Sequence, residues 1–339
     1  MLGVGALTVT HSLESSQIAR SDYVGYVWTD ALLIRSLSRM SLALHRSESG
    51  TRTLGHIVRK QIADAIEALT SRSPSDQVVH DARKELKRAR ATLRLLRDAM
   101  GDKAYRREND ALRDAARPLS LIRDRKVQLD TLNRLVARFR AAEELPPTEQ
   151  LRRVLRRERA LTRRTAFRGP KPFKQSRAAL QLIHHRARRW RTGSGGWEVL
   201  GAGLKRVYGK GRKALAAAQA DRTPAKLHEW RKQTKYLWHE LQLLEPLWPG
   251  MIGELADQAH KLSEYLGDDH DLSVLRDKVI ELGEALGKSE CRALLRLLDA
   301  YRTELRDKAM VLGHRLYEET PADFEARFAQ YWRDWRRKR

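Results

Sequence analysis

Two segments of the chain, 148 positions apart, carry basic and apolar residues in the same order. The first reads VHDARKELKRARATLRLLR and the second LHEWRKQTKYLWHELQLLE. The matched basic pairs are His80 with His228, Arg83 with Arg231, Lys84 with Lys232 and Lys87 with Lys235. A second match follows in each case, because LSLIRDRKV at 119–127 resembles LGDDHDLSV at 266–274. Two matches in the same order predict the duplication of a whole structural unit.

The apolar residues around these segments recur at helical spacing, and Leu, Ala and Arg outnumber β-branched and aromatic residues. Hydrophobic residues make up 41% of the sequence, enough for a sizeable core. We therefore expect an all-α fold without strands. The expected helices are 53–70, 76–99, 103–117, 120–141, 148–165, 174–191, 197–220, 223–245, 249–266, 269–286, 288–317 and 321–335.

The segment RGPKPF at 168–173 is the clearest break in this pattern. It predicts a boundary between a first helical half, 51–167, and a second, 174–339. Residues 1–50 show no long amphipathic segment and are expected to form a disordered tail.

The formal net charge of +24 implies an anionic partner, which composition leaves open among nucleic acid, a phosphate polymer and a membrane surface. No apolar run approaches the length of a membrane span, and the first residues make a poor signal peptide, so the cytoplasm is the expected location. Cys291 is the single cysteine, which excludes a disulfide within the chain, and its helical neighbours predict a buried packing thiol.

Each of the repeated helices is expected to have a cationic front and an apolar back. The predicted front residues are His80, Arg83, Lys84, Lys87 and Arg94 on the first helix, with Arg88 beside them, and His228, Arg231, Lys232 and Lys235 on the second. Arginine offers a planar fork of donors that matches phosphate oxygens, and lysine offers a mobile positive charge. Most charge runs are simply solvated faces. Here the front is almost entirely cationic, occurs twice and begins with histidine both times.

At these residues the chain resembles the CHAD family, the conserved histidine α-helical domain, over roughly residues 52–335. In that family each half carries an H-x-x-R-(K/R)-x-x-(K/R) pattern followed by an L-G-x-x-x-D-like segment. The resemblance implies two helical bundles related by a pseudo-two-fold axis, with a basic cavity or channel between them. It also implies inorganic polyphosphate as the ligand of the paired basic residues, and an association with polyphosphate granules.

The segment GLKRVYGKGRKAL resembles the family's basic, tyrosine-containing stretch. It adds Lys205, Arg206, Tyr208, Lys210, Arg212 and Lys213 as secondary candidates. Three positions depart from the family or from the other half. Ser120 stands where the family's glycine is usual, and Tyr236 and Trp238 replace the basic Arg88 and Arg90 of the first half.

The cluster DDHD at 268–271 raises the alternative of a metal-dependent phosphohydrolase, which needs several carboxylates and imidazoles converging from separate helices. Helix capping by Asp268 and Asp269 is the expected role instead, and Asp124 and Asp271 are expected to pair with nearby basic residues. We predict a non-catalytic polyphosphate-binding protein without metal or cofactor. Non-specific nucleic-acid binding is the alternative, and metal-dependent hydrolysis ranks below both. The oligomeric state stays open.

Overall fold

The computed structural model describes residues 44, 46, 48–71, 73–140, 146–169, 173–190 and 192–337. Within these residues the regular secondary structure is entirely helical, which confirms the predicted fold class. Most of the predicted tail lies outside the described residues. No helix in the described ranges is long and apolar enough to cross a membrane.

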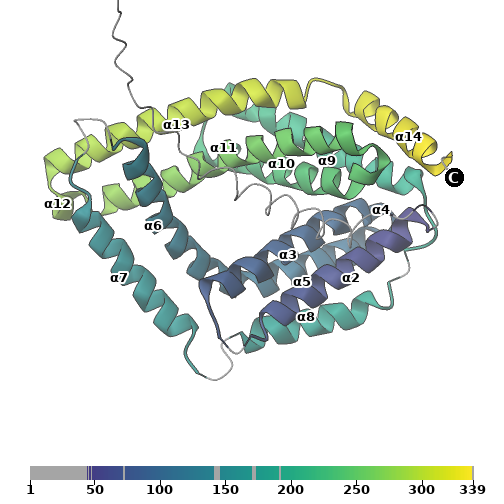
Figure 1. Cartoon of the computed structure of the whole chain (residues 1–339), viewed down its shortest axis with the longest axis horizontal. Coiled ribbons are helices and arrows are strands. Elements are labelled where there is room, and N and C mark those ends of the chain that lie inside the picture. The colour runs from purple at the N-terminus through teal and green to yellow at the C-terminus, as the bar shows by residue number, and fades with distance from the viewer. Residues whose placement is uncertain are drawn as a thin grey trace, which may run out of the picture. The chain divides into compact units, whose positions relative to one another are not determined.

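The first helices form a group around the repeated segment that contains His80. Figure 1 shows α2, α3, α5 and α8 lying beside one another, and α2 contacts both α3 and α8. Ser49 begins α2 by accepting a hydrogen bond from the Arg52 amide, and Ser75 begins α3 through the Val78 amide. The bounds are α2 Gly50–Ala68, α3 Asp76–Leu95, α4 Arg97–Met100, α5 Asp102–Ala116, η1 Arg117–Leu119, α6 Ser120–Arg138, α7 Glu149–Ala166 and α8 Lys174–Ala187.

The later helices form a second group, in which α10, α11 and α13 run side by side (Figure 1). Gly287 takes a φ of 87° directly before α13, a left-handed conformation that glycine adopts without strain. The bounds are α9 Trp197–Ala220, α10 Pro224–Leu244, η2 Glu245–Leu247, α11 Pro249–Glu281, α12 Gly283–Leu286, α13 Lys288–Leu316 and α14 Pro321–Arg337.

One expected helix break is wrong. The predicted helices 249–266 and 269–286 are mostly a single helix, α11, which continues through Gly267 and ends at Glu281. Gly267 is buried, and a Cβ added there would meet the Arg231 guanidinium at 3.1 Å. The glycine therefore leaves room beside α11 for the Arg231 guanidinium of α10, and it does not end a helix.

A hydrophobic cluster joins helices that are distant in sequence. Leu132 of α6 and Leu155 of α7 are buried in it together with Leu275 of α11 and Leu298 of α13. Cys291 packs against the same cluster and is only partly buried, so the predicted thiol environment is less enclosed than expected. On the other side, α8 packs against α2 and α5. Helices from before and after 168–173 thus pack together in both places. The division into halves at 168–173 stays a prediction, and so does the internal duplication.

Candidate polyanion-binding site

The two repeated histidine helices, α3 and α10, contact one another and bring Lys87 close to Lys235. Lys87 keeps contact with solvent, but burial of its ammonium group, followed by the charge of Lys235, lowers its pKa to about 6. Burial, followed by the charges of Arg231 and Arg123, lowers the pKa of Lys235 to about 7. Burial and neighbouring positive charge both disfavour the ammonium form, so the two shifts indicate that several basic groups lie near one another here.

Arg83 and Arg231 belong to the same two helices and contact α6 and α11. Arg83 donates a hydrogen bond of 2.6 Å from Nη1 to the Ser120 hydroxyl at the start of α6. Arg231 lies against Gly267 of α11, where the absence of a side chain leaves room for its guanidinium. Ser120, which departs from the family pattern, thus supplies a partner for Arg83, whereas Gly267 supplies space for Arg231.

Arg123 of α6 joins these cations without having been predicted. Its positive charge lowers the pKa of Arg83, Lys87, Arg231 and Lys235, in each case after the larger effect of burial. Five basic residues from three helices therefore gather at one place. We call Arg83, Lys87, Arg123, Arg231 and Lys235 the cationic cluster.

Two carboxylates of α11 partly balance this charge. Asp271 lies 4.0 Å from the Arg123 guanidinium and 3.8 Å from that of Arg134, and Asp268 lies 3.3 Å from Arg134. The predicted pairing of Asp271 with basic neighbours is confirmed, and Asp124 pairs with Arg123 at 3.4 Å. Burial is the largest cause that raises the pKa of Asp268.

A polar cavity of about 620 Å³ opens beside the cluster, with Arg231 and Lys235 in its wall. Residues of α6, α11 and α13 supply the rest of its charged lining. Its basic side chains are Arg134, Arg138, Arg231, Lys235, Lys261 and Lys308, beside His260, and its acidic ones are Glu264, Asp268, Asp271 and Glu304.

The histidines begin the two cationic faces. His80 and His228 each lie four residues after the first residue of their helix, and both are exposed. Burial is the largest cause that lowers the pKa of each. His228 lies against His270 of α11, with 4.6 Å between ring centroids. Neutral imidazoles therefore stand at the start of both faces at pH 7, each able to donate one N–H.

The remaining predicted residues of the two helices lie outside the cluster or have partners. Lys84 is exposed, and Lys232 is exposed beside the Glu229 carboxylate, with which it pairs. Arg88 pairs with Glu85 at 2.9 Å. The Arg94 guanidinium lies 3.5 Å from the centre of the Tyr236 ring. Tyr236, which stands in the second half where the first half has a basic residue, therefore makes a cation–π contact with an arginine of the first half.

The basic stretch of α9, predicted as a secondary part of the binding site, does not lie at the cationic cluster. Tyr208 is fully buried, stacks on Phe324 with 3.9 Å between centroids, and donates its hydroxyl to the Leu316 carbonyl. Its hydroxyl is therefore already used in the core. Arg206 pairs with Asp98 at 3.0 Å, and Lys205 is exposed.

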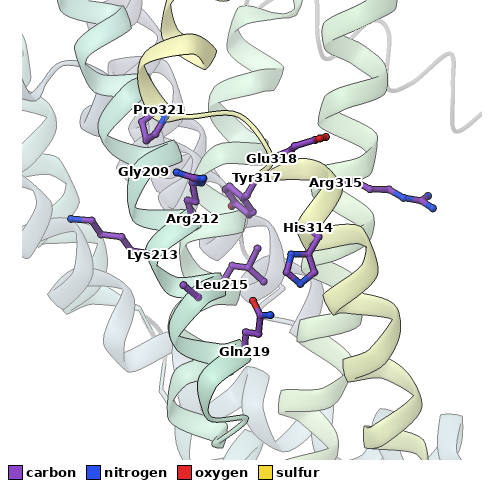
Figure 2. Close-up of a pocket in the computed structure, with 11 residues that line it drawn as sticks. Gly209, Arg212, Lys213, Leu215, Gln219, His314, Arg315, Tyr317, Glu318 and Pro321 are labelled. Carbon is purple, nitrogen blue, oxygen red and sulfur yellow. The ribbon is translucent and has the colours of Figure 1, made fainter.

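Three further residues of α9 lie on two other surfaces. Lys210 has a pKa lowered first by burial and then by Arg97 and Arg94, which places it near the end of α3. Arg212 and Lys213 line a separate pocket of about 860 Å³ between α9 and the end of α13. Figure 2 shows Lys213 pointing away from Tyr317 in that pocket.

The DDHD cluster has a structural role other than the one expected. Asp268 and Asp269 lie inside α11, so their predicted role as helix caps is wrong. Asp269 is buried and accepts hydrogen bonds from Arg302 at 3.1 Å and Arg306 at 2.8 Å, which fastens α11 to α13. Among the described residues no three His, Cys, Asp or Glu side chains form a group that could hold a metal ion.

Sequence reasoning missed the basic residues that α6 and α11 contribute. Arg123 and Arg134 are 11 positions apart and so lie on one face of α6, and Lys261 belongs to α11. Arg123 was a usable signal, because it lies within the second repeated match at 119–127. What the sequence could not show was that this face of α6 lies toward α11, where Asp268 and Asp271 pair with its arginines.

The comparisons with known proteins agree with the helical fold. The model of the CHAD domain matches residues 56–279. Two solved structures are similar. PptA from Streptomyces chartreusis is 15% identical and has a TM-score of 0.58, with 79% of this chain and 99% of that chain covered. The CHAD domain from the plant Ricinus communis is 16% identical and has a TM-score of 0.52, with 80% of this chain and 94% of that chain covered. No curated protein matches the sequence. Because the family model covers about two thirds of the sequence and the fold agrees, the chain belongs to the CHAD domain family.

Proposed function

We propose that this protein binds inorganic polyphosphate in the cationic cluster and the adjoining cavity, and that it does so without hydrolysing the polymer. The observation that carries the proposal is the gathering of five basic residues from three helices, the cationic cluster, beside a polar cavity. Holding like charges together in poorly hydrated space is unfavourable unless an anion neutralises them. The ligand must therefore bring dense negative charge to this place.

A phosphate polymer fits better than a single small anion because the cations form a series. Arg83 and Lys87 come from α3, Lys235 from α10, and Arg134 and Lys261 from the wall of the cavity. A flexible chain with one negative charge per phosphate can satisfy these groups in succession. The counterions that it releases supply much of the binding free energy.

Binding without turnover is part of the proposal because the carboxylates nearest the cluster are already engaged. Asp271 faces Arg123 and Arg134, and Asp268 faces Arg134. Hydrolysis of a phosphoanhydride needs a group that positions or activates water. These carboxylates instead hold the arginines in place.

The test replaces one helix face at a time. One variant carries Arg83→Ala, Lys84→Ala and Lys87→Ala, and the other carries Arg231→Ala, Lys232→Ala and Lys235→Ala. A matched control removes three exposed basic residues of α13 through Lys288→Ala, Arg292→Ala and Arg296→Ala. Each variant is titrated with long-chain polyphosphate by calorimetry at two salt concentrations, after circular dichroism has shown that its helicity is intact.

We expect each cluster variant to lose at least about two orders of magnitude in affinity, because it removes two cluster cations and each charge-assisted contact contributes about 1.5–3 kcal/mol. The dependence of affinity on salt should flatten in both, and the α13 control should stay close to wild type. If each cluster variant kept wild-type affinity at half the stoichiometry, the two faces would be independent sites. Unchanged binding in both would refute the proposal.

The absence of turnover is tested separately. Protein incubated with polyphosphate and magnesium or manganese should release no phosphate above the protein-free control. Release that saturates with polyphosphate, and that disappears with His80→Ala, would show an enzyme.

A further inference from the structure

Helix α7 has an outward face formed by arginines that play no part in the proposed polyphosphate site. Arg153, Arg156, Arg157 and Arg164 are all exposed and lie within one sector of the helix. Ala160 lies in the middle of that sector. Arg156 lies 3.9 Å from Glu149, and the other three have no carboxylate partner within the part of the chain that the structure describes. We call Arg153, Arg157 and Arg164 the arginine row.

The inward-facing arginines of the same helix do have carboxylate partners. Arg159 and Arg163 both pair with Asp76 at the start of α3. Glu158 pairs with Arg125 of α6 and Lys278 of α11. The helix is therefore fastened to the molecule by ion pairs on one side, while the arginine row on the other side is left for a partner outside the chain.

We propose that α7 binds duplex DNA by lying along the major groove, with the arginine row against the phosphates. An α-helix with its side chains is about 10–12 Å wide, which matches a B-form major groove of about 12 Å. Arg153 and Arg164 are 11 residues apart, so the row extends for about 16 Å at 1.5 Å per residue. The small side chain of Ala160 lets the helix backbone come close to the groove.

An anionic membrane is the weaker partner for this face. A helix that lies in a membrane surface inserts an apolar stripe beneath its basic residues. Leu151 and Leu155 of α7 are instead buried in the hydrophobic cluster with α11 and α13. Leu161, which is 55% exposed, is a single apolar side chain beside the arginine row. The face carries positive charge but has no apolar stripe that could insert into a membrane. Its chemistry therefore favours the phosphates of a duplex.

The experiment uses the full chain and a fluorescent 20-base-pair DNA duplex, with binding followed by anisotropy between 50 and 200 mM salt. One variant carries Arg153→Ala, Arg157→Ala and Arg164→Ala. The control is the α13 variant described above, which removes the same amount of positive charge from another exposed helix. A second variant, Ala160→Glu, keeps every arginine and places one negative charge in the middle of the face.

We expect the α7 triple variant to weaken DNA binding at least about tenfold and to reduce the slope of log K against log salt by about 2.7, because roughly 0.9 of a counterion is released per phosphate contact. Ala160→Glu should also weaken binding, and the α13 control should not. Polyphosphate binding should survive in the α7 variants, while the cluster variants should keep their affinity for DNA. The two proposals therefore fail or succeed independently.

Two outcomes would overturn the inference. Equal losses in the α7 and α13 variants would show that net charge alone binds DNA. Tighter binding to vesicles of anionic phospholipid than to the duplex, lost in the α7 variant, would assign the face to a membrane. An RNA duplex serves as a third ligand, and it should bind more weakly because the deep, narrow major groove of A-form RNA does not admit a helix.

Discussion

Lys87 and Lys235 make polyphosphate binding dependent on pH. Their pKa values are about 6 and about 7 in the free protein, so both are largely neutral at pH 8. Contact with phosphate favours the charged form and raises both values, so binding takes up protons at pH values where the free lysines have lost theirs. Affinity should therefore fall as the pH rises through the two pKa values and level off below about pH 5, where both lysines are protonated in the free protein.

Calorimetry in two buffers of different ionisation enthalpy measures the number of protons taken up. Lys87→Arg keeps the positive charge but stays protonated throughout this range, so it should lower that number by about one at pH 8. Equal proton uptake in wild type and Lys87→Arg would contradict the assignment of Lys87.

Gly267 gives a second prediction at the scale of one residue. Alanine is favoured over glycine inside a helix by about 0.5–1 kcal/mol, so Gly267→Ala should leave α11 as stable as before or more so. Its added Cβ would meet the Arg231 guanidinium at 3.1 Å and displace it from the cationic cluster. We expect weaker polyphosphate binding with no loss in melting temperature. Gly250→Ala, where an added Cβ meets nothing within 4 Å, is the control.

At the scale of elements, the Asp269 carboxylate connects α11 with α13. Asp269→Ala would leave the buried Arg302 without this partner, and breaking a buried ion pair from one side costs about 3–5 kcal/mol. We expect a large fall in the free energy of unfolding, measured by denaturant titration. Asp277→Ala, an exposed position on the same helix, should change it little. Similar values for the two variants would mean that Arg302 finds water or another partner.

The elements also show how far the sequence could predict this molecule. The limits expected for 197–220 match α9, and those for 288–317 match α13 to within one residue, because apolar spacing and flanking Gly or Pro mark helix ends. The break at Gly267 was mispredicted because a glycine that serves close packing looks like one that ends a helix. The faces of α3 and α10 were predictable from periodicity. Their contact with Arg123 of α6 was not, because periodicity describes one helix at a time.

At the scale of the whole molecule, the net charge of +24 makes stability sensitive to the surrounding ions. Raising salt from about 20 to about 200 mM shortens the Debye length to roughly 7 Å and screens repulsion among the cations. We expect the melting temperature of the free protein to rise over this range. The rise should be smaller in the variant lacking Arg231, Lys232 and Lys235. A melting temperature that falls with salt would mean that surface ion pairs outweigh this repulsion.

Polyphosphate should raise the melting temperature further at constant salt. A ligand at 100 times its dissociation constant stabilises the folded state by about 2.7 kcal/mol. Differential scanning calorimetry with and without the polymer measures this increase. The cluster variants should show little of it, whereas the α7 triple variant should show all of it.

The hydrophobic cluster that joins α6 and α7 to α11 and α13 has a consequence for how the chain is made. Leu132 and Leu155 are buried against Leu275 and Leu298, which a ribosome adds more than a hundred residues later. Until α11 and α13 have emerged from the exit tunnel, the leucines of α6 and α7 can be covered only by one another. A nascent chain stalled before residue 270 should therefore expose apolar surface and recruit chaperones, and the full chain, once released, should fold.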